Sequence, residues 1–461
     1  MVGPNYVRPT VDTPAMFKEW QGWKSAEPQD EVPRDHWWEA YGDKDLDSLI
    51  EQVNVSNQNI KQAEAQYRAA RALAASARAA YFPVLALDGT ATRATAGTSV
   101  LNAGSGSSTG TVATATSSAA SVSNLFSPSL DVSWELDLWG KLRRMAENAA
   151  ENMKASAADL AAARLSAQSE LAQDYFQLRI SDELTRVYDS NVEGLQKSLK
   201  IAEFQYSVGV ASQADVAQAK TLLKSTQAAA IDLKIQRAQL EHAIAVLTGK
   251  PASDFSLPRA QPAMQVPAIS LLQPSELLER RPDIAASERL VAAANANIGV
   301  AKAAYYPSLT LSGEIGYENS SLTHLFTVAN RFWSVGPLLA QTLFDGGARH
   351  AITDQAIANY DASVAAYRQT VLAAFQDTED NLVALRVLAE EIAVQNEATA
   401  AADKSEAIAL FQYKSGIVSY LNVVVAQSTA LANERAAWTL RGRQLASSVA
   451  LVKSLGGGWR R

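Results

Sequence analysis

The sequence of 461 residues contains no cysteine and only four histidines. Without cysteine, the chain has no disulfide framework, no zinc site with cysteine ligands and no thiol nucleophile. The histidines share no ligand spacing on a helix, which argues against a metal site. No G-x-S-x-G, P-loop or dinucleotide fingerprint is present, so we expect neither an enzyme nor a cofactor. The four histidines are His36, His242, His324 and His350.

Long apolar runs and a basic excess are also missing. No stretch approaches the roughly 18 apolar residues that a membrane-spanning helix needs. Lys and Arg number 41 against 48 Asp and Glu, which gives a net charge of −7. Nucleic acid is therefore not an expected partner. Met1 leads straight into "VGPNYVRPTVDTP", and if the protein is exported we expect this to be a mature or engineered form.

Long alanine-rich segments with apolar residues at helical spacing dominate what is present. The first ends at Tyr81-Phe82-Pro83, where Pro83 cannot continue a helix. We expect helices over about 46–80, 141–207, 213–248, 283–306, a segment ending near 414, and a last one reaching 455.

Four strands are expected between these helices, over about 84–93, 128–139, 308–318 and 332–344. The clearest lies in "LDVSWELDLW", where apolar and polar residues alternate with period 2. Residues 94–127, almost all Gly, Ser, Thr and Ala, suit a flexible loop. The apolar set is Leu130, Val132, Trp134, Leu136 and Leu138, and the acids of the opposite faces are Asp131, Glu135, Asp137 and, from the third strand, Glu314.

The chain repeats its plan. The segment from Asn57 aligns without a gap with the segment from Arg281. After the loop, the two halves of the chain align at a second, smaller spacing, which pairs Gly140 with Gly347 and Gly209 with Gly416. A long internal repeat constrains the architecture strongly, and each copy is helix–strand–strand–helix–break–helix. We expect an arm over 1–43, a first repeat over 44–249, a linker over 250–280, a second repeat over 281–457 and a tail over 458–461.

The two breaks resemble each other. "FQYSVGVASQAD" begins at Phe204 and "FQYKSGIVSYLN" at Phe411. Gly209 and Gly416 suit the left-handed conformation that ends a helix. We therefore predict two hairpin tips, over about 206–215 and 413–422.

Serines are expected to cap the helices that follow these tips. Ser212 and Ser419 stand at the cap positions, and Ser212-x-x-Asp215 has the spacing of a capping box. Helix capping is thus one interpretation of Asp215. Asn422, its counterpart in the second tip, fits that role less well.

Four strands with one apolar face cannot close alone in lipid, where open edges are not tolerated. The smallest membrane barrels have about 8 strands, so several chains would have to combine their strands. Apolar residues would face lipid, and the acids would line a wet, cation-preferring lumen. Aromatic residues favour the membrane–water boundary. Those at the strand–helix junctions are Tyr81, Phe82, Trp139, Tyr305, Tyr306 and Phe344. The alternative is a half-exposed sheet on a soluble coiled-coil protein of the cell envelope.

The segments "LLERRPDIAASERLVAAANANIGVAKAAYYPSLTLSG", "LFDGGARHA", "FQYKSGIVSYLNVVVAQ" and "SLGGGW" resemble the TolC-type outer membrane factors. The closest branch is the lipoproteins of tripartite efflux pumps, which the start "VGPNYVRP" also resembles. The resemblance implies a homotrimer with a 12-stranded barrel in the outer membrane and a helical tunnel in the periplasm. It also implies an adaptor protein and an inner-membrane pump as partners. A type I secretion channel is the alternative within the family. The family's acylated cysteine would precede Val2. Met1 stands in that place here, or the cysteine lies upstream of this sequence, so an N-terminal lipid is a hypothesis.

The resemblance also assigns roles at the tips. It implies that Asp215 bonds Tyr413 and holds the closed tip together. Acids six and nine residues after Gly416 often form a cation-selecting ring, but here Asn422 and Val425 occupy those positions. Leu421 matches an apolar constriction, with ordinary helix packing as the alternative, and Tyr420 beside it can serve either role.

Overall fold

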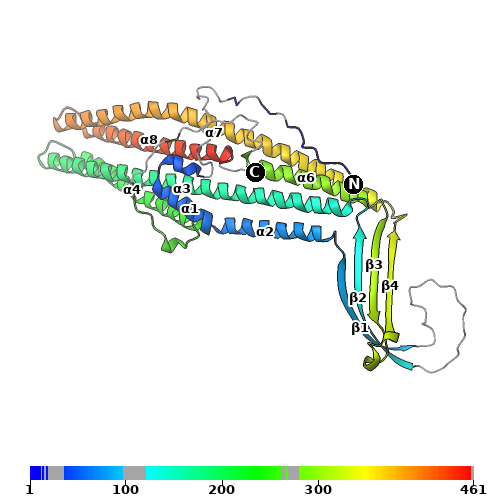
Figure 1. Cartoon of the computed structure of the whole chain (residues 1–461). Helices are drawn as coiled ribbons and strands as arrows, with labels where there is room; N and C mark the ends of the chain where they lie inside the picture. Colours follow the sequence, from blue (N-terminus) through cyan, green and yellow to red (C-terminus); the bar gives the residue numbers. More distant parts are fainter. Residues whose placement is uncertain are drawn as a thin grey trace. The chain divides into compact units, whose positions relative to one another are not determined.

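The computed structural model describes residues 1–11, 13–14, 17–18, 36–96, 121–260, 266–267 and 280–457. It divides into two compact units. Unit 1 contains the sheet, and unit 2 contains the helix hairpins (Figure 1). Unit 1 comprises Met1–Val7, Arg71–Glu151 and Ala292–Ala362, and unit 2 comprises Arg8–Ala70, Asn152–Val291 and Ser363–Arg461.

The helices follow the predicted order. The α-helices are α1 (Lys44–Ser56), α2 (Gln58–Ala79), α3 (Lys141–Ser207), α4 (Gln213–Leu247), α6 (Pro282–Ala303), α7 (Ala348–Lys414) and α8 (Tyr420–Ser454). Short 3-10 helices are η1 (Trp37–Tyr41), η2 (Ala252–Asp254), η3 (Leu322–His324) and η4 (Val328–Asn330).

The two halves of the chain build elements of equal length. Helices α3 and α7 each have 67 residues, and α4 and α8 each have 35. The start of α7 follows that of α3 at the same offset as the start of α8 follows that of α4. Helices α2 and α6 each have 22 residues, and their starts are separated by the larger of the two sequence spacings, the one that applies before the loop. The two spacings read from the sequence are therefore the spacings of the elements.

The first predicted helix is wrong in one respect, because it is two helices. Asn57 interrupts it with an extended backbone. Its side-chain oxygen accepts hydrogen bonds from the backbone N–H groups of Asn59 and Ile60, which caps α2. Its amide nitrogen donates to the carbonyl of Leu247 at 2.9 Å. An asparagine that satisfies free N–H groups starts a helix rather than continuing one.

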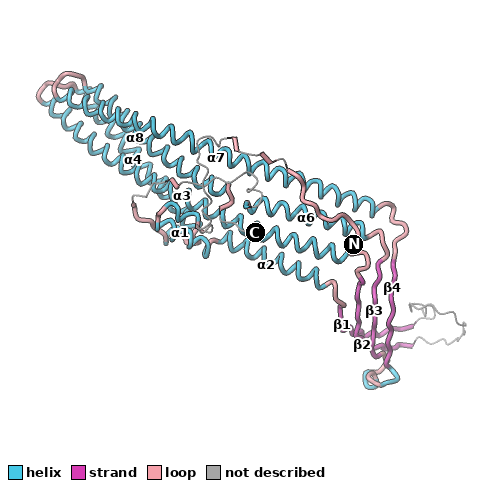
Figure 2. Tube along the Cα trace, turned by 45° about the horizontal axis from the view of Figure 1, so that its top comes forward, coloured by secondary structure: helices cyan, strands magenta, loops and turns pink. Residues whose placement is uncertain are grey.

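The strands form one antiparallel sheet in the order β1-β2-β3-β4 (Figure 2). The strands are β1 (Val84–Ala96), β2 (Ser121–Leu136), β3 (Ser308–Tyr317) and β4 (Arg331–Ala340). The predicted loop is too long on both sides, since main-chain pairing continues to Ala96 opposite Ser121. The rest of the predicted loop, 97–120, lies outside the described residues.

The predicted strands over 128–139 and 332–344 extend too far towards the helices. Strand β2 ends at Leu136 because Asp137 already caps α3, and β4 ends at Ala340. Leu138, Trp139 and Phe344 therefore lie in the connections. Pro337 lies in β4, which is an edge strand of the sheet within one chain.

Unit 2 has a core beside η1 and α1. Leu46, Ile50 and Val53 on one face of α1 are fully buried. They belong to one cluster with apolar side chains of η1, α3 and α8. The hydroxyls of Tyr41 and Ser448 are 2.8 Å apart within it. The buried residues of α7 also recur at three- and four-residue intervals, as expected for coiled-coil packing: Tyr367, Val371, Ala374, Thr378, Leu382, Leu385 and Leu388.

Both hairpin tips close with the same backbone motif. Gly209 and Gly416 have φ of 77° and 75°, the left-handed region. At the first tip the Gly209 N–H donates to the carbonyl of Tyr206, and the Val210 N–H to that of Gln205. The corresponding bonds recur around Gly416. This is the 6→1 and 5→2 pattern that ends a helix at a glycine.

We predict that Gly416→Ala lowers the free energy of unfolding by about 1 to 2 kcal/mol, because a Cβ is strained in the left-handed conformation. The control is Gly194→Ala inside α3, where the backbone is helical and nothing lies within 4 Å of an added Cβ. That control should raise stability by up to about 1 kcal/mol. Chemical denaturation of the two purified variants measures both effects. Equal shifts in the same direction would contradict the assignment.

Candidate functional site

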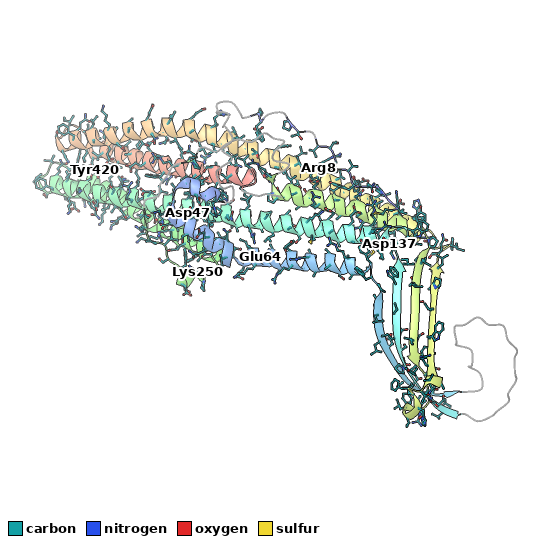
Figure 3. The ribbon with its side chains drawn as sticks, in the orientation of Figure 1. Arg8, Asp47, Glu64, Asp137, Lys250 and Tyr420 are labelled. Atoms are coloured by element: carbon teal, nitrogen blue, oxygen red, sulfur yellow. The ribbon has the colours of Figure 1, made fainter. Side chains whose placement is uncertain are left out.

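The tips are joined by a buried cluster of apolar side chains in unit 2. Tyr413 at the end of α7 and Tyr420 at the start of α8 are 5% and 1% exposed. Their ring centroids lie 5.1 Å apart in an edge-to-face arrangement. Ala202 of α3 and Ala219 of α4 belong to the same cluster, as does Val423. The second tip therefore packs its aromatic pair against the first tip. Figure 3 labels Tyr420 among the side chains.

The hydrogen bond predicted between Asp215 and Tyr413 is not formed in this structure. One Asp215 carboxylate oxygen accepts from both the backbone N–H and the hydroxyl of Ser212, each at 2.9 Å. The Ser212 hydroxyl oxygen accepts in turn from the Asp215 N–H at 3.3 Å. This is the complete capping box of α4, and the capping interpretation of Asp215 is the one that the structure bears out.

Both tyrosine hydroxyls of the cluster are buried without a hydrogen-bond partner among the described residues. Burial raises the pKa of Tyr413, and the nearby charge of Asp215 raises it further. Burial likewise raises the pKa of Tyr420 to about 12, with smaller contributions from Tyr413 and Asp215. Both phenols are therefore neutral at physiological pH, and apolar packing of their rings holds the tips together.

Ser419 does not repeat the cap of Ser212. It stands at the N-cap of α8 with an extended backbone, but its side chain makes no capping bond. Position 422 is an asparagine, so the second tip lacks the carboxylate that completes the capping box of the first tip. Leu421 and Val425 are 52% and 58% exposed, and Asn422 is exposed too. The constriction at Leu421 stays a prediction.

The sheet in unit 1 carries a continuous apolar face. Cross-strand partners place Leu87 opposite Leu130, Leu130 opposite Ile315, and Ile315 opposite Trp333. Leu85, Val132, Trp134, Leu136, Leu309, Leu311, Val335 and Leu339 continue this face by the same register. Leu87 is 80% and Trp333 69% exposed. A soluble monomer rarely exposes so large an apolar patch.

The strand acids do not all have the predicted role. Asp131 and Glu314 are cross-strand partners on the polar face. Glu135 is on the same face but pairs with Lys141 at 3.0 Å. Asp137, labelled in Figure 3, lies beyond the strand.

Asp137 caps helix α3. Its carboxylate accepts from the N–H groups of Leu142 and Arg143 and pairs with the Arg143 guanidinium at 2.9 Å. Partial desolvation opposes ionisation, but the bonds from Arg143 and the Leu142 N–H together hold the pKa of Asp137 below its ordinary value. Its placement on the strand was therefore wrong, and its role in the lumen stays a prediction.

The aromatic residues at the strand–helix junctions make ring contacts and hydrogen bonds within the connections between strands and helices. Trp139 stacks on Tyr306 with centroids 4.8 Å apart, and its ring nitrogen donates to the carbonyl of Pro307 at 2.7 Å. The ring nitrogen of Trp134 donates to the carbonyl of Tyr81 at 2.9 Å. The remaining aromatic residues predicted here, Phe82, Tyr305 and Phe344, are 68%, 40% and 89% exposed. Leu138, predicted for the lipid face, is 55% exposed in the connection after β2.

The sequence interpretation gave no role to the arginine of "RRPDI". Arg281 is 9% exposed, and it contacts the carboxylates of Asp283 at 2.7 Å and Asp377 at 3.3 Å. It also donates to the carbonyl of Ser454 at the end of α8. This residue therefore ties the start of α6 to α7 and α8. The unusual Arg-Arg-Pro start of a helix was the signal that could have identified it.

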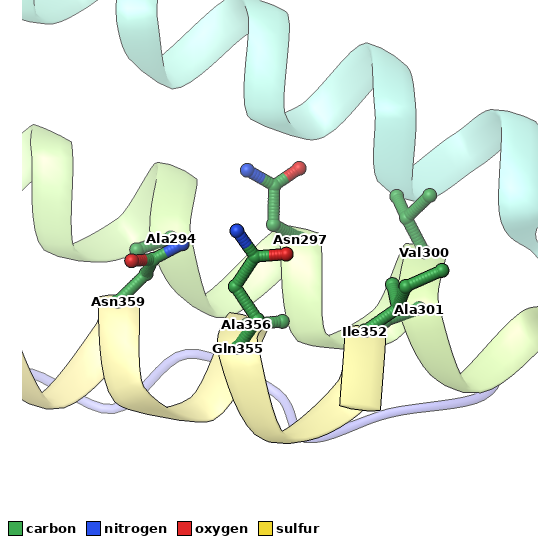
Figure 4. A pocket seen from close by; sticks show the side chains of 8 residues that line it. All are labelled: Ala294, Asn297, Val300, Ala301, Ile352, Gln355, Ala356 and Asn359. Carbon is green, nitrogen blue, oxygen red and sulfur yellow. The ribbon is translucent and has the colours of Figure 1, made fainter. Parts of the chain in front are cut away.

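A pocket in unit 1 lies between α6 and α7 (Figure 4). The amides of Asn297, Gln355 and Asn359 line it and offer hydrogen bonds, but no acid, base or nucleophile. The other lining residues are Ala294, Val300, Ala301, Ile352 and Ala356.

The described residues hold no group of three or more His, Asp or Glu side chains that could bind a metal ion. Of the helices in that same part of the chain, none combines the length and apolar character that crossing a membrane requires.

Known proteins resemble this chain in sequence and in fold. The family model described as outer membrane efflux protein matches residues 49–250 and 273–457. The pyoverdine export outer membrane protein OpmQ of Pseudomonas aeruginosa is 33% identical over 426 residues, covering 92% of this chain and 87% of that protein. The cation efflux system protein CusC of Escherichia coli is 28% identical over 463 residues, covering 99% and 95%.

A solved structure of the outer-membrane channel OprN covers 100% of both chains with a TM-score of 0.90 and 29% identity. The family model alone spans most of the chain, and the resemblance to TolC-type proteins is confirmed. The chain therefore belongs to the outer membrane efflux protein family, and it is an efflux channel of the outer membrane that extends into the periplasm.

Proposed function

We propose that three copies of this chain form the exit duct of a tripartite efflux pump, through which small molecules pass passively from the periplasm to the exterior. The observation that carries this proposal is the sheet with an exposed apolar face and two unpaired edges, β1 and β4. Three copies supply twelve strands, an even number within the range of bacterial barrels. Pairing β4 of one copy with β1 of the next leaves no edge in the lipid.

The polar face would then line the lumen. Asp131 and Glu314 are adjacent across β2 and β3, and three copies would repeat this acidic pair around the pore. Lys141 and Arg143 neutralise Glu135 and Asp137 near the junction. We therefore propose that cation preference in the barrel depends on Asp131 and Glu314.

The tips are proposed to contact the adaptor protein. Relatives of this chain are named as parts of an efflux pump and of a cation efflux system, and the proposed partners of this duct are an adaptor and an inner-membrane pump. Apolar residues at the turns support a docking surface there: Val208 is 56%, Val210 70% and Ile417 69% exposed. Docking would separate the tips and open the duct. OpmQ and CusC are named for very different cargoes, which fits a duct whose specificity is set by the pump.

A lipid at the N-terminus completes the proposal. The Val2 N–H donates to the carbonyl of Trp139 at 2.9 Å, and Met1 packs against Gly140. These residues belong to the junction, the proposed depth of the membrane surface. An acyl chain on a cysteine before Val2 would reach the bilayer from this position. Mass spectrometry of the native mature protein would contradict this part by finding an unmodified terminus.

A charge on the two faces of the sheet should have opposite consequences. Leu87→Arg places a cation on the proposed lipid face, where it should destabilise the barrel by about 2 to 4 kcal/mol near the midplane. Ser133→Arg places the same side chain on the polar face and should be tolerated. The measurement is the yield of heat-modifiable trimers in detergent and their conductance in planar bilayers. A detergent-free monomer, or equal tolerance of both variants, would refute the barrel.

Two substitutions of one tyrosine test how the tips are closed. Tyr413→Phe removes only an unbonded hydroxyl, so single-channel conductance of the closed state should stay unchanged or fall. Tyr413→Ala removes the ring, at a cost of roughly 3 to 5 kcal/mol for a buried aromatic, and should make the duct leak. If Tyr413→Phe alone opened the channel, a hydrogen bond of the hydroxyl would be responsible, and closure by packing would be disproved.

A further inference from the structure

The hairpin end of the sheet, opposite the junctions, has a second group of aromatic residues on the apolar face. Tyr317 and Trp333 share this face with Ile315, because Ile315 pairs with Trp333 and side chains alternate along a strand. The Phe326 ring packs edge-on against Tyr317, with centroids 5.4 Å apart and the planes at 72°. Phe326 is 72% exposed. The loop between β3 and β4 therefore places an aromatic residue on the face proposed to contact lipid.

This loop is held in place by its own bonds. Asn319 forms a backbone bridge to Phe126 of β2. The Asn330 amide donates to the carbonyl of His324 and to the hydroxyl of Thr327 at 2.6 and 2.8 Å. Leu325 is 4% exposed and anchors the segment. The exposure of its neighbour Phe326 therefore belongs to a folded loop.

A cation stands at the same end of this face. Arg331 is the cross-strand partner of Tyr317 and lies two residues before Trp333, so it shares their face. It is exposed, and its guanidinium has no hydrogen bond or ion pair with any residue that the structure describes. Arg93, near the end of the other edge strand, is exposed on the same face by the register. Long cationic side chains at the end of an apolar band place their charge at the level of lipid head groups.

Below the aromatic residues, the apolar face has a notch. Gly313 lies between Val132 and Val335, its cross-strand partners. Because it lacks a side chain, a hollow of about 340 Å³ opens there, with Leu130, Val132, Ile315 and Trp333 among its walls. Nearly all of this lining is apolar. The notch has the character of a site for a hydrocarbon chain.

The separation of these features matches one lipid molecule. The ten residues of β3 span about 33 Å, and strands tilted as in outer-membrane barrels place this length across an apolar band of about 25 Å. Tyr317 and Arg331 then lie at the outer rim, and Gly313 lies four residues deeper. We propose that this end of the face binds a phosphate-bearing lipid of the outer leaflet, with Arg331 on the phosphate and an acyl chain in the notch over Gly313. This inference rests on the proposed barrel, which turns the face towards lipid.

The test uses purified trimers in detergent and native mass spectrometry with two probes, bisphosphorylated lipid A and the same lipid without phosphates. The wild type should bind the phosphorylated lipid at least about tenfold more tightly, since guanidinium–phosphate bonds are charge-assisted. Arg331→Gln should remove most of this preference. Arg71→Gln, which removes an exposed cation from α2, is the control and should change nothing.

A second variant tests the notch independently of charge. An added Cβ at Gly313 meets only ordinary contacts, with Ser334 at 3.7 Å and Val335 at 3.8 Å, so Gly313→Leu should fold and fill the hollow. It should weaken binding of both probes several-fold. Ser312→Leu, one residue away on the polar face, should leave both affinities unchanged.

Bilayer conductance of the same preparations separates the two proposals. If the wild type and variants conduct but bind the probes equally well, or if the wild type ignores the phosphates, the lipid site is disproved and the barrel stands. If the wild type forms no conducting trimer, the barrel fails and the lipid site fails with it.

Discussion

An unpaired strand edge is the constraint on which this structure depends. Among the residues that the structure describes, the outer edges of β1 and β4 pair with no further strand. In hydrocarbon, every unpaired N–H or C=O group costs several kcal/mol. Helices satisfy these groups internally, so the long helices can continue into water as separate rods. The sheet cannot do so. The exposed apolar face makes water unfavourable, and the open edges make lipid unfavourable for a single copy. Membership of the outer membrane efflux family resolves this conflict, because in that setting other copies can supply the missing edges.

The contact between the hairpin tips and the starts of the helices use different kinds of interaction. At the hairpin tips, alanines of the first hairpin allow the rings of Tyr413 and Tyr420 to pack closely, and the phenol oxygens remain unbonded. Charged bonds are found instead where helices begin, at Asp137, Asp215 and Arg281. Apolar contacts are non-directional and can be exchanged gradually, whereas bonds at helix starts fix a register. The tip contact, which we propose to open, and the helix starts are therefore built from different chemistry.

The architecture could be predicted from the sequence because it follows from periodicity and repetition. The glycine breaks, the strand alternation and the two constant offsets between the halves all depend on spacing. The errors concern competition between local and distant partners. Asp215 had two possible partners, and only coordinates show that Ser212 holds it. Asp137 continues the alternation of the strand in the sequence, yet its carboxylate caps the helix that follows. The Arg-Arg-Pro start of a helix marks Arg281 in the sequence, but its partners Asp377 and Ser454 lie far along the chain. The role of Phe326 likewise required knowledge of which distant segments meet, and no local pattern carries that information.

The equal lengths of the paired helices have a mechanical consequence. A single inserted residue turns everything beyond it by about 100° and advances it by about 1.5 Å. In α7, an insertion after Leu388 would rotate the rest of the helix relative to the buried stripe from Tyr367 to Leu388. An insertion in α3 alone would make the first hairpin longer than the second, so that the two tips would no longer meet. Length changes that keep the packed faces in register are therefore expected as about seven residues, or two turns, at a time. Because the paired helices are equal in length, such a change would have to occur in both halves of the chain.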